Sequence, residues 1–346
     1  MPWPDLRPLR ILVIRYRFIG DTILAIPTLR NLREAFPHAV IDILTEPISG
    51  DTLAHCPYKN ELLHYDPQLK GERKRNAGFP TDIWAAARFL RARRYDRCYI
   101  LRRSFSSAIL PLLTGIPHRV GFATEGRGWL LTRSTPYPDK HEVECFLDVL
   151  RADGIPVTST HNENWTAPAT DRNVDARLSA TGRFRVFVCA KSVFALKDWA
   201  PERFAEIITW LVRERDAEIH FCDAPGNAGY YRQILAGIPA DLRGHCHDWS
   251  RDLSIREAGS LMRRMQLCLG IDTGFIHIAA SFHVPVVGLY GPLEPWRWHP
   301  WDTKHTIIRP ADVSGPRPLL RVSVAEVQAA LEPFLVAACS HATSST

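Results

Sequence analysis

The 346-residue sequence lacks the features that mark several classes of protein. It has no run of about 18 apolar residues, which a helix needs to span a bilayer. Its start, MPWPDLRPLR, lacks the apolar core of a secretory signal peptide. It has no low-complexity tract, and 46% of its residues are hydrophobic, which excludes a disordered chain. We therefore expect a globular protein, soluble or attached only peripherally to a membrane.

The eight cysteines form no C-x-x-C pair. Several lie inside apolar, strand-like runs such as RVFVCA and QLCLGID. We therefore expect buried, reduced thiols in a cytosolic protein rather than a disulfide framework. The HCH triplet at residues 245–247 offers metal ligands. Because no second ligand cluster stands at a suitable spacing, an exposed loop is the expected structure there.

Neither charge sign dominates the chain, which has 43 basic and 37 acidic residues and a net charge of +6. This small basic excess suits anionic substrates or an anionic membrane surface. It is too weak to indicate nucleic-acid binding by itself.

Strand-like and helix-like segments alternate through the first half of the chain. The strands are RILVIRY, VIDILTE, RCYILRR and HRVGF, and the helices are GDTILAIPTLRNLREAF, PTDIWAAARFLRARR and HEVECFLDVLRADG. Gly154 is suited to end the last of these helices. Such alternation predicts parallel βαβ units.

Residues 155–175 are rich in Pro, Thr, Asn and Ala and are predicted to form a linker. The alternation then restarts, with strands in FRVFVCA, AEIHFCDA, QLCLGID and VPVVGLYG and helices in APERFAEIITWLVRER, SIREAGSLMRRM and TGFIHIAASF. The sequence thus predicts an α/β fold with domains over residues 1–160 and 176–321. A final helix over about 322–338, within a tail of residues 322–346, could cross back to the first domain.

The end of the strand QLCLGID carries four residues suited to phosphate binding. Asp272 and Thr273 precede a predicted helix whose free N–H groups and positive dipole end attract anions. Gly274 permits close backbone approach, and His277 lies on the same helical face as Thr273. The alternative is an ordinary N-cap with His277 in the core. The turn alone favours that alternative.

Two further segments follow strands in the same way. Gly20 and Asp21 come after the first strand, where Asp21 is either a helix cap or a general base. Lys197 lies between a strand and the helix that starts near Pro201, where it either reaches a phosphate or is solvated. Open α/β sheets bind ligands at the carboxyl ends of their strands, so we expect all these residues to face a cleft between the domains.

Four segments resemble glycosyltransferase family 9, the ADP-heptose:lipopolysaccharide heptosyltransferases. They are ILVIRYRFIGDTILAIPTLRNLREAFP, GIPHRVGF, KDWAPERFAEI and DTGFIHIAASFHVPVVGLYGPLEP. The resemblance implies a GT-B fold, in which two Rossmann-like domains face each other across a cleft. It also implies that the N-terminal domain binds the acceptor and that the C-terminal domain binds the nucleotide sugar.

The resemblance assigns roles residue by residue. Asp21, preceded by Gly20, matches the presumed catalytic base, and Lys197 matches the lysine that meets the donor diphosphate. The positions that match the loop and helix holding the donor are Asp272, Thr273, Gly274 and His277.

Two segments depart from the family pattern. Where the family has a Pro-Gly pair and a small or hydroxylic residue, this chain has Ala190-Lys191-Ser192. Ser192 is suited to serve as the donor-binding hydroxyl, and Lys191 is an unexpected second cation. A Gly-Gly-Pro-like loop near the nucleoside reads CDAPGN here, so the base preference stays open.

The resemblance implies an inverting transfer from an ADP-sugar to a hydroxyl of an anionic, lipopolysaccharide-core-like glycolipid. No cofactor and no metal are expected, because no D-x-D motif stands at a strand end. Two alternatives remain: another nucleotide sugar with a different acceptor, or a nucleotide-binding protein without catalysis.

Basic segments in the first half suit an anionic acceptor, a membrane surface or an ordinary solvated helix face. They are KGERKR, RARRYDR and LRRS. Trp84 and Phe89 are expected in the core. The expected location is the cytoplasm, with peripheral contact to the inner face of the membrane.

Overall fold

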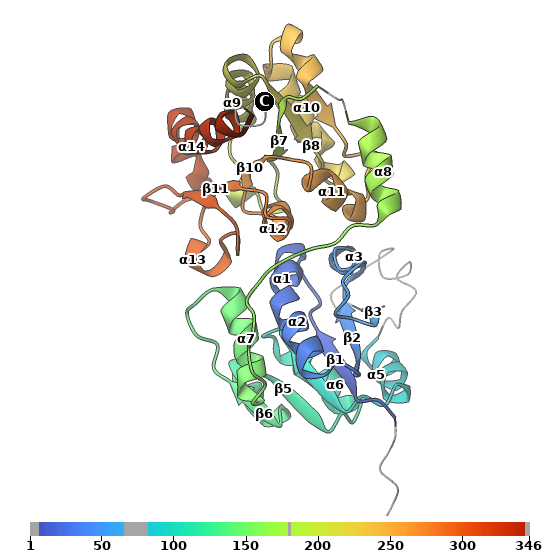
Figure 1. Cartoon of the computed structure of the whole chain (residues 1–346). Coiled ribbons are helices and arrows are strands. Elements are labelled where there is room, and N and C mark those ends of the chain that lie inside the picture. Colours follow the sequence, from blue (N-terminus) through green and yellow to red (C-terminus); the bar gives the residue numbers. More distant parts are fainter. Residues whose placement is uncertain (1–6, 66–81, 179–180, 343–346) are drawn as a thin grey trace, which may run out of the picture. The chain divides into compact units, whose positions relative to one another are not determined.

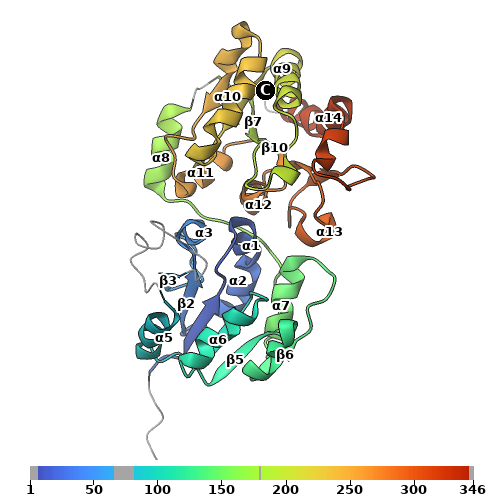
Figure 2. The same cartoon turned by 180° about the vertical axis from the view of Figure 1, so that it is seen from behind.

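The computed structural model describes residues 7–65, 82–178 and 181–342, with backbone alone for 336–342. Contacts divide the chain into two units, residues 1–162 and 163–346. Each unit contains a six-stranded parallel sheet with helices on both faces (Figures 1 and 2). None of the described helices is long and apolar enough to cross a membrane.

The first unit has the strand order β3-β2-β1-β4-β5-β6. Its strands are β1 Arg10–Ile14, β2 Val40–Thr45, β3 Glu61–His64, β4 Arg97–Ile100, β5 His118–Phe122 and β6 Arg133–Thr135. Its α-helices are α1 Ile19–Leu24, α2 Ile26–Ala35, α3 Pro47–Asp51, α5 Ile83–Ala92, α6 Phe105–Leu113 and α7 Glu142–Ala152. The strand order reverses between β1 and β4, which is where sheets of this type bind ligands.

The second unit repeats this topology in the order β12-β11-β10-β7-β8-β9. Its strands are β7 Phe184–Cys189, β8 Ala217–Phe221, β9 Cys246–Asp248, β10 Leu267–Ile271, β11 Val286–Leu289 and β12 His305–Ile308. Its α-helices are α8 Pro168–Arg177, α9 Pro201–Arg215, α10 Ala228–Gly237, α11 Ile255–Met262, α12 Gly274–Ser281, α13 Pro295–Trp298 and α14 Val324–Ala342. The order reverses between β7 and β10.

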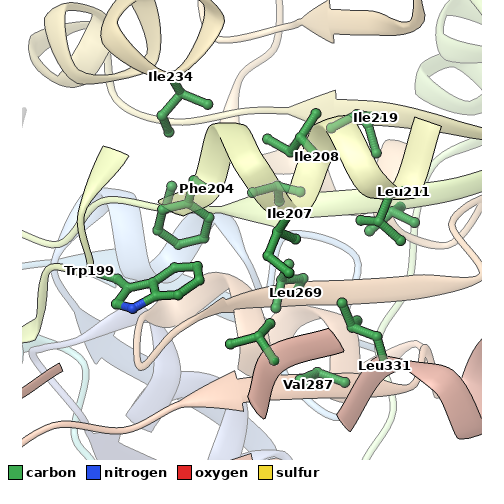
Figure 3. Close-up of a cluster of buried hydrophobic side chains, with 14 of the residues drawn as sticks. Trp199, Phe204, Ile207, Ile208, Leu211, Ile219, Ile234, Leu269, Val287 and Leu331 are labelled. Carbon is green, nitrogen blue, oxygen red and sulfur yellow. The ribbon is translucent and has the colours of Figure 1, made fainter. Parts of the chain in front are cut away.

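The core on one face of the second sheet joins α9, α10 and α14 to the central strands (Figure 3). Trp199 and Phe204 pack edge to face, with ring centroids 5.0 Å apart. The indole N–H of Trp199 donates to the carbonyl of Val322 at 3.0 Å. This bond satisfies the polar atom of a fully buried ring and fixes the start of α9.

The sequence predicted one helix over residues 20–36, and the structure has two. Helix α1 ends at Leu24, and α2 begins at Ile26 with Pro27 in its first turn. Proline lacks the N–H that would continue the α1 hydrogen-bond ladder, so the chain restarts the helix there. Gly154 follows α7 with φ of 74°, as expected for a residue that ends a helix.

Two predicted loops contain regular structure. The linker at residues 155–175 includes the start of α8, whose polar sequence gave little helical periodicity, and α8 packs against α11. The HCH triplet is not an exposed loop, because Cys246 begins the edge strand β9, which pairs with β8. Helix α14 packs against α9 and β12 within the second unit. Among the described cysteines, six of seven are buried and all are free.

Candidate functional site

Lys197 and Asp272 meet at the carboxyl edge of the second sheet. The Lys197 Nζ lies 2.7 Å from Asp272 Oδ2 and 3.2 Å from the Asp272 carbonyl oxygen. Lys197 follows β7 and Asp272 follows β10, the two strands that flank the reversal of strand order. Both side chains are mostly buried, so the predicted site residues are brought together at the ligand-binding position of this sheet type.

The N-terminus of α12 begins beside this ion pair. Thr273 is the N-cap residue, with extended backbone angles, but its side chain makes no capping hydrogen bond. Its Oγ1 is buried and has no hydrogen-bond partner among the described residues. Asp272 contacts Lys197 instead of its own helix. The ordinary side-chain cap is therefore not formed, and a buried hydroxyl and a helix end remain to bind an anion.

Gly274 and His277 complete the turn. Gly274 is the first residue of α12, and His277 is buried one turn further along. Helix α12 is anchored on the sheet by Phe275, whose ring packs on that of Phe187 with centroids 5.4 Å apart. The structure thus gathers Lys197, Asp272, Thr273 and Gly274, with the buried His277 in the first turn of the same helix.

Ser192 lies in the loop between β7 and α9. Its Oγ accepts a hydrogen bond from the Phe194 N–H at 3.2 Å, and its own N–H donates to Asp198 Oδ1 at 3.3 Å. Lys191 forms an ion pair with Asp198. Ser192 is therefore built into the loop that carries Lys197.

Asp21 lies in the first turn of α1, just after β1 of the first unit. It forms an ion pair with Arg15, and its Oδ2 accepts from the Phe18 N–H at 3.4 Å. Gly20 precedes it and is buried. The carboxylate thus bonds the start of the helix, as a capping residue does. It also follows β1, next to the reversal of strand order, where a general base for a bound acceptor is expected. The structure is compatible with both roles.

A second carboxylate close to Asp21 was not found from the sequence. Glu142 is buried at the start of α7, where it contacts the Tyr137 hydroxyl. Burial, with the negative charge of Asp21 adding to it, raises the pKa of Glu142. Acidic residues are common at the start of helices, where they interact favourably with the helix dipole. The local sequence therefore did not distinguish Glu142 as a site residue.

The CDAPGN loop, which replaces the family's glycine-rich segment, is organised by Asp223. Its carboxylate accepts hydrogen bonds from the Ala224 N–H at 2.6 Å, Asn227 Nδ2 at 2.9 Å and the Tyr231 hydroxyl at 3.0 Å. Burial raises the pKa of Asp223. The conformation of this loop is therefore held by hydrogen bonds to Asp223. Which nucleoside base the loop accepts stays open.

The basic segments of the first half have different environments. KGERKR lies outside the described residues. In RARRYDR, Arg93 pairs with Glu61 and Arg97 pairs with Asp153. Trp84 is 67% exposed, so the prediction that it is a core residue is wrong. It lies on the outer face of α5, and the partly buried Phe89 packs against the core.

The match to known proteins agrees with this architecture. The family model of glycosyltransferase family 9 (heptosyltransferase) matches residues 83–317. Lipopolysaccharide heptosyltransferase 2 of Escherichia coli K12 is 27% identical over 315 residues, which cover 87% of this chain and 88% of that protein.

Two solved structures share the fold. The structure of E. coli ADP-heptose lipopolysaccharide heptosyltransferase II gives a TM-score of 0.79 at 23% identity and covers 95% of this chain and 99% of that one. E. coli heptosyltransferase WaaC with ADP-2-deoxy-2-fluoro heptose gives 0.72 at 19% identity and covers 94% and 99%. The expected GT-B fold and the family resemblance are confirmed, and the roles of the individual site residues stay predictions. The chain belongs to glycosyltransferase family 9, the heptosyltransferases.

Proposed function

We propose that this chain is an inverting glycosyltransferase that moves a heptose, or a related sugar, from an ADP-sugar to a hydroxyl of a lipopolysaccharide-core-like acceptor. Family membership supports the reaction class, and the names of relatives and of structures with the same fold suggest the ADP-heptose donor and the lipopolysaccharide acceptor. One observation carries the donor assignment. Lys197, the buried Thr273 hydroxyl and the uncapped start of α12 converge where the strand order of the second sheet reverses.

In the proposed reaction, Asp21 accepts the proton of the acceptor hydroxyl, whose oxygen attacks the anomeric carbon of the sugar. The bond from that carbon to the diphosphate oxygen breaks, and the nucleoside diphosphate leaves with the electron pair. Lys197, the Thr273 hydroxyl, the Gly274 N–H and Ser192 stabilise its developing charge. Asp272 and His277 complete the proposed donor-binding set, and Asp272 also orients Lys197 through their ion pair.

We propose that the reaction needs neither a metal nor a cofactor. The charges that would neutralise the leaving diphosphate come from the lysine and the helix end. A divalent cation would compete with Lys197 for the same oxygens.

We also propose that the first unit contacts the cytoplasmic face of the membrane through α5. Trp84, Arg88 and Arg91 lie at i, i+4 and i+7, and all three are exposed. Tryptophan prefers the headgroup region, and arginines are attracted to anionic lipids.

This contact can be tested by flotation with vesicles of phosphatidylglycerol or phosphatidylcholine. Wild-type protein should float with the anionic vesicles only. The Trp84→Ser/Arg88→Ser/Arg91→Ser variant should lose binding, while Arg213→Ser/Arg232→Ser, two exposed arginines of the second unit, should keep it. Equal binding by both variants would exclude α5 as the contact.

The proposed function is tested by incubating purified protein with ADP-heptose and a heptose-deficient lipopolysaccharide core. ADP release and a mass increase of one heptose on the acceptor are expected, with inverted anomeric configuration by NMR. Thermal-shift measurements with ADP, GDP, UDP and their nucleotide sugars test the alternatives. A ligand that binds the native state raises the midpoint of thermal unfolding. Stabilisation by a different nucleotide sugar would show that the donor is not an ADP-sugar. Binding without any transfer or donor hydrolysis would favour the non-catalytic alternative.

A further inference from the structure

The loop from Ala190 to Trp199 connects β7 to α9 and carries Lys197. Three of its apolar side chains point into solvent: Val193 is 84%, Phe194 52% and Leu196 47% exposed. Hydrophobic packing therefore contributes little to the conformation of the middle of this loop. Its order must come from polar contacts.

Asp198 provides the contacts inside the loop. Its Oδ1 accepts from the Ser192 N–H at 3.3 Å, and its other oxygen binds the Lys191 ammonium. The Lys197 N–H also donates to the Phe194 carbonyl at 2.9 Å. The Asp198 carboxylate is buried, so its two contacts are partly shielded from water. They connect the beginning of the loop, at Lys191 and Ser192, to its end at Asp198.

Two consecutive tyrosines of α10 hold the two ends of the loop. The Tyr231 hydroxyl accepts from the Ala190 N–H at 3.1 Å and donates to Asp223 Oδ2 at 3.0 Å. The Tyr230 hydroxyl donates to the Trp199 carbonyl. Because Asp223 follows β8, the Ala190 end of the loop is tied through Tyr231 to the neighbouring strand, and the Trp199 end is tied to α10.

Lys197 precedes Asp198 directly, so this network determines where the lysine side chain starts. A lysine side chain has four rotatable bonds, and its ammonium is placed reliably only when its backbone is fixed. In the structure its Nζ reaches both the carboxylate and the carbonyl of Asp272. Preorganised charge binds more tightly because less freedom is lost on binding.

We propose that Asp198 is a positioning residue for the donor diphosphate, holding the 190–199 loop with Tyr230 and Tyr231 so that Lys197 stands ready at the end of β10. Lys191 neutralises Asp198 and does not itself contact the donor. This inference rests on the proposed donor site at Lys197. It gives roles to three residues, Asp198, Tyr230 and Tyr231, to which the family resemblance assigned none.

Calorimetric titration with ADP tests the inference through Lys197. Asp198→Asn keeps the shape and the acceptor oxygen but loses the charge that binds Lys191. We expect it to weaken ADP binding about five- to tenfold, near the effect of losing one ordinary hydrogen bond. In a Lys197→Ala background the same substitution should have no further effect, because Asp198 acts only through that lysine.

Controls separate positioning from general damage. Glu218→Gln removes a buried carboxylate at the amino end of β8, where it pairs with Arg185, and should leave ADP affinity unchanged. Tyr230→Phe removes one hydroxyl from the end of the loop and should weaken ADP about twofold to fivefold. Because the Trp199 carbonyl loses its hydrogen bond, the thermal midpoint should fall by a few degrees at most. In turnover, Asp198→Asn should raise KM for the donor more than it lowers kcat.

Three results would overturn the inference. Wild-type ADP affinity in both Asp198→Asn and Tyr230→Phe would remove the positioning role. Equal losses from Asp198→Asn with and without Lys197 would show that Asp198 acts by another route. If Lys197→Ala itself binds ADP normally, the proposed donor site fails and this inference fails with it, whereas a loss in Lys197→Ala alone overturns only the inference.

Discussion

Lys197 and Asp272 form a largely buried ion pair with 2.7 Å between Nζ and Oδ2, although 75 positions separate them in the chain. The free protein therefore already holds Lys197, the cation that we propose binds the diphosphate, in place and paired with a carboxylate. Removing the lysine would leave the buried Asp272 charge uncompensated and would turn an attractive site into a repulsive one.

We therefore expect Lys197→Ala to weaken ADP binding by about tenfold or more in calorimetry. Lys197→Ala/Asp272→Asn should recover part of the loss, because the repulsive charge is gone. Lys304→Ala, which removes a cation stacked on Phe334, is the control. Unchanged affinity in Lys197→Ala would contradict the diphosphate site.

Thr273→Ala separates binding from stability. The Thr273 Oγ1 is buried without a hydrogen-bond partner among the described residues, so deleting it removes a desolvation cost and should not lower the thermal midpoint. ADP affinity should nevertheless fall several-fold. Thr209→Ala removes a hydroxyl that donates to the Ala205 carbonyl of its own helix and should keep wild-type affinity. A lower midpoint with unchanged affinity would make Thr273 purely structural.

Asp21→Asn should reduce kcat by ~10² to 10⁴-fold while ADP affinity stays the same, since loss of a general base slows proton transfer without touching the donor. The amide retains an acceptor for the Phe18 N–H. Glu144→Gln, at the exposed ion pair with Arg151, is the matched control. Near-wild-type turnover of folded Asp21→Asn would reduce this residue to a helix cap.

Transfer should persist in excess EDTA. The leaving diphosphate is neutralised by Lys197 and the start of α12 in our proposal, and a modest stimulation by magnesium would be consistent with binding to the anionic acceptor. Complete loss of activity in EDTA, restored by magnesium or manganese, would overturn the metal-free mechanism and make Asp272 a candidate ligand.

His220 should make folding stability depend on pH. Burial, with the neighbouring His247 adding to it, lowers the pKa of His220 to about 3 from 6.5. The Trp249 indole N–H donates to its Nδ1 at 3.1 Å, which requires an unprotonated nitrogen. As pH falls from about 6.5 toward 3, the unfolded chain takes up a proton that the folded chain refuses. Stability therefore falls by up to about 1.4 kcal/mol per pH unit.

Urea unfolding from pH 7 to pH 4 measures this slope. His220→Asn keeps an acceptor for Trp249 and should flatten it, whatever its stability at pH 7. His38→Asn, at an exposed histidine, should retain the wild-type slope. Parallel curves for wild type and His220→Asn would show that this histidine does not titrate on unfolding.

Gly270→Ala should destabilise the second unit. A Cβ at Gly270 would lie 1.9 Å from Cys189 Sγ and 2.6 Å from the Cys189 carbonyl oxygen on the adjacent β7. Relieving this clash should cost about 1–3 kcal/mol in urea unfolding. Gly244→Ala, where the added Cβ would meet no described atom within 4 Å, should have little effect.

Part of the site could be predicted from local patterns. The apolar runs predicted β7 and β10, and the polar residues directly after them had to lie at one sheet edge. The sequence predicted Trp84 to be a core residue because it is a large apolar side chain within an amphipathic helix. The pattern did not show that it lies on the outer face of α5. Asp198 was missed because an acid beside the first turn of a helix is common at any surface.

The amino-acid sequence by itself determined the strand and helix alternation, the helix start at Pro201 and the family, since these depend on residues close together in the chain. Only the tertiary structure decided that Lys197 contacts Asp272, that Tyr230 and Tyr231 hold the ends of one loop, and that the Thr273 hydroxyl caps nothing. Those relationships depend on the order in which parallel strands pair, and strand order is set by the packing of whole βαβ units rather than by local periodicity.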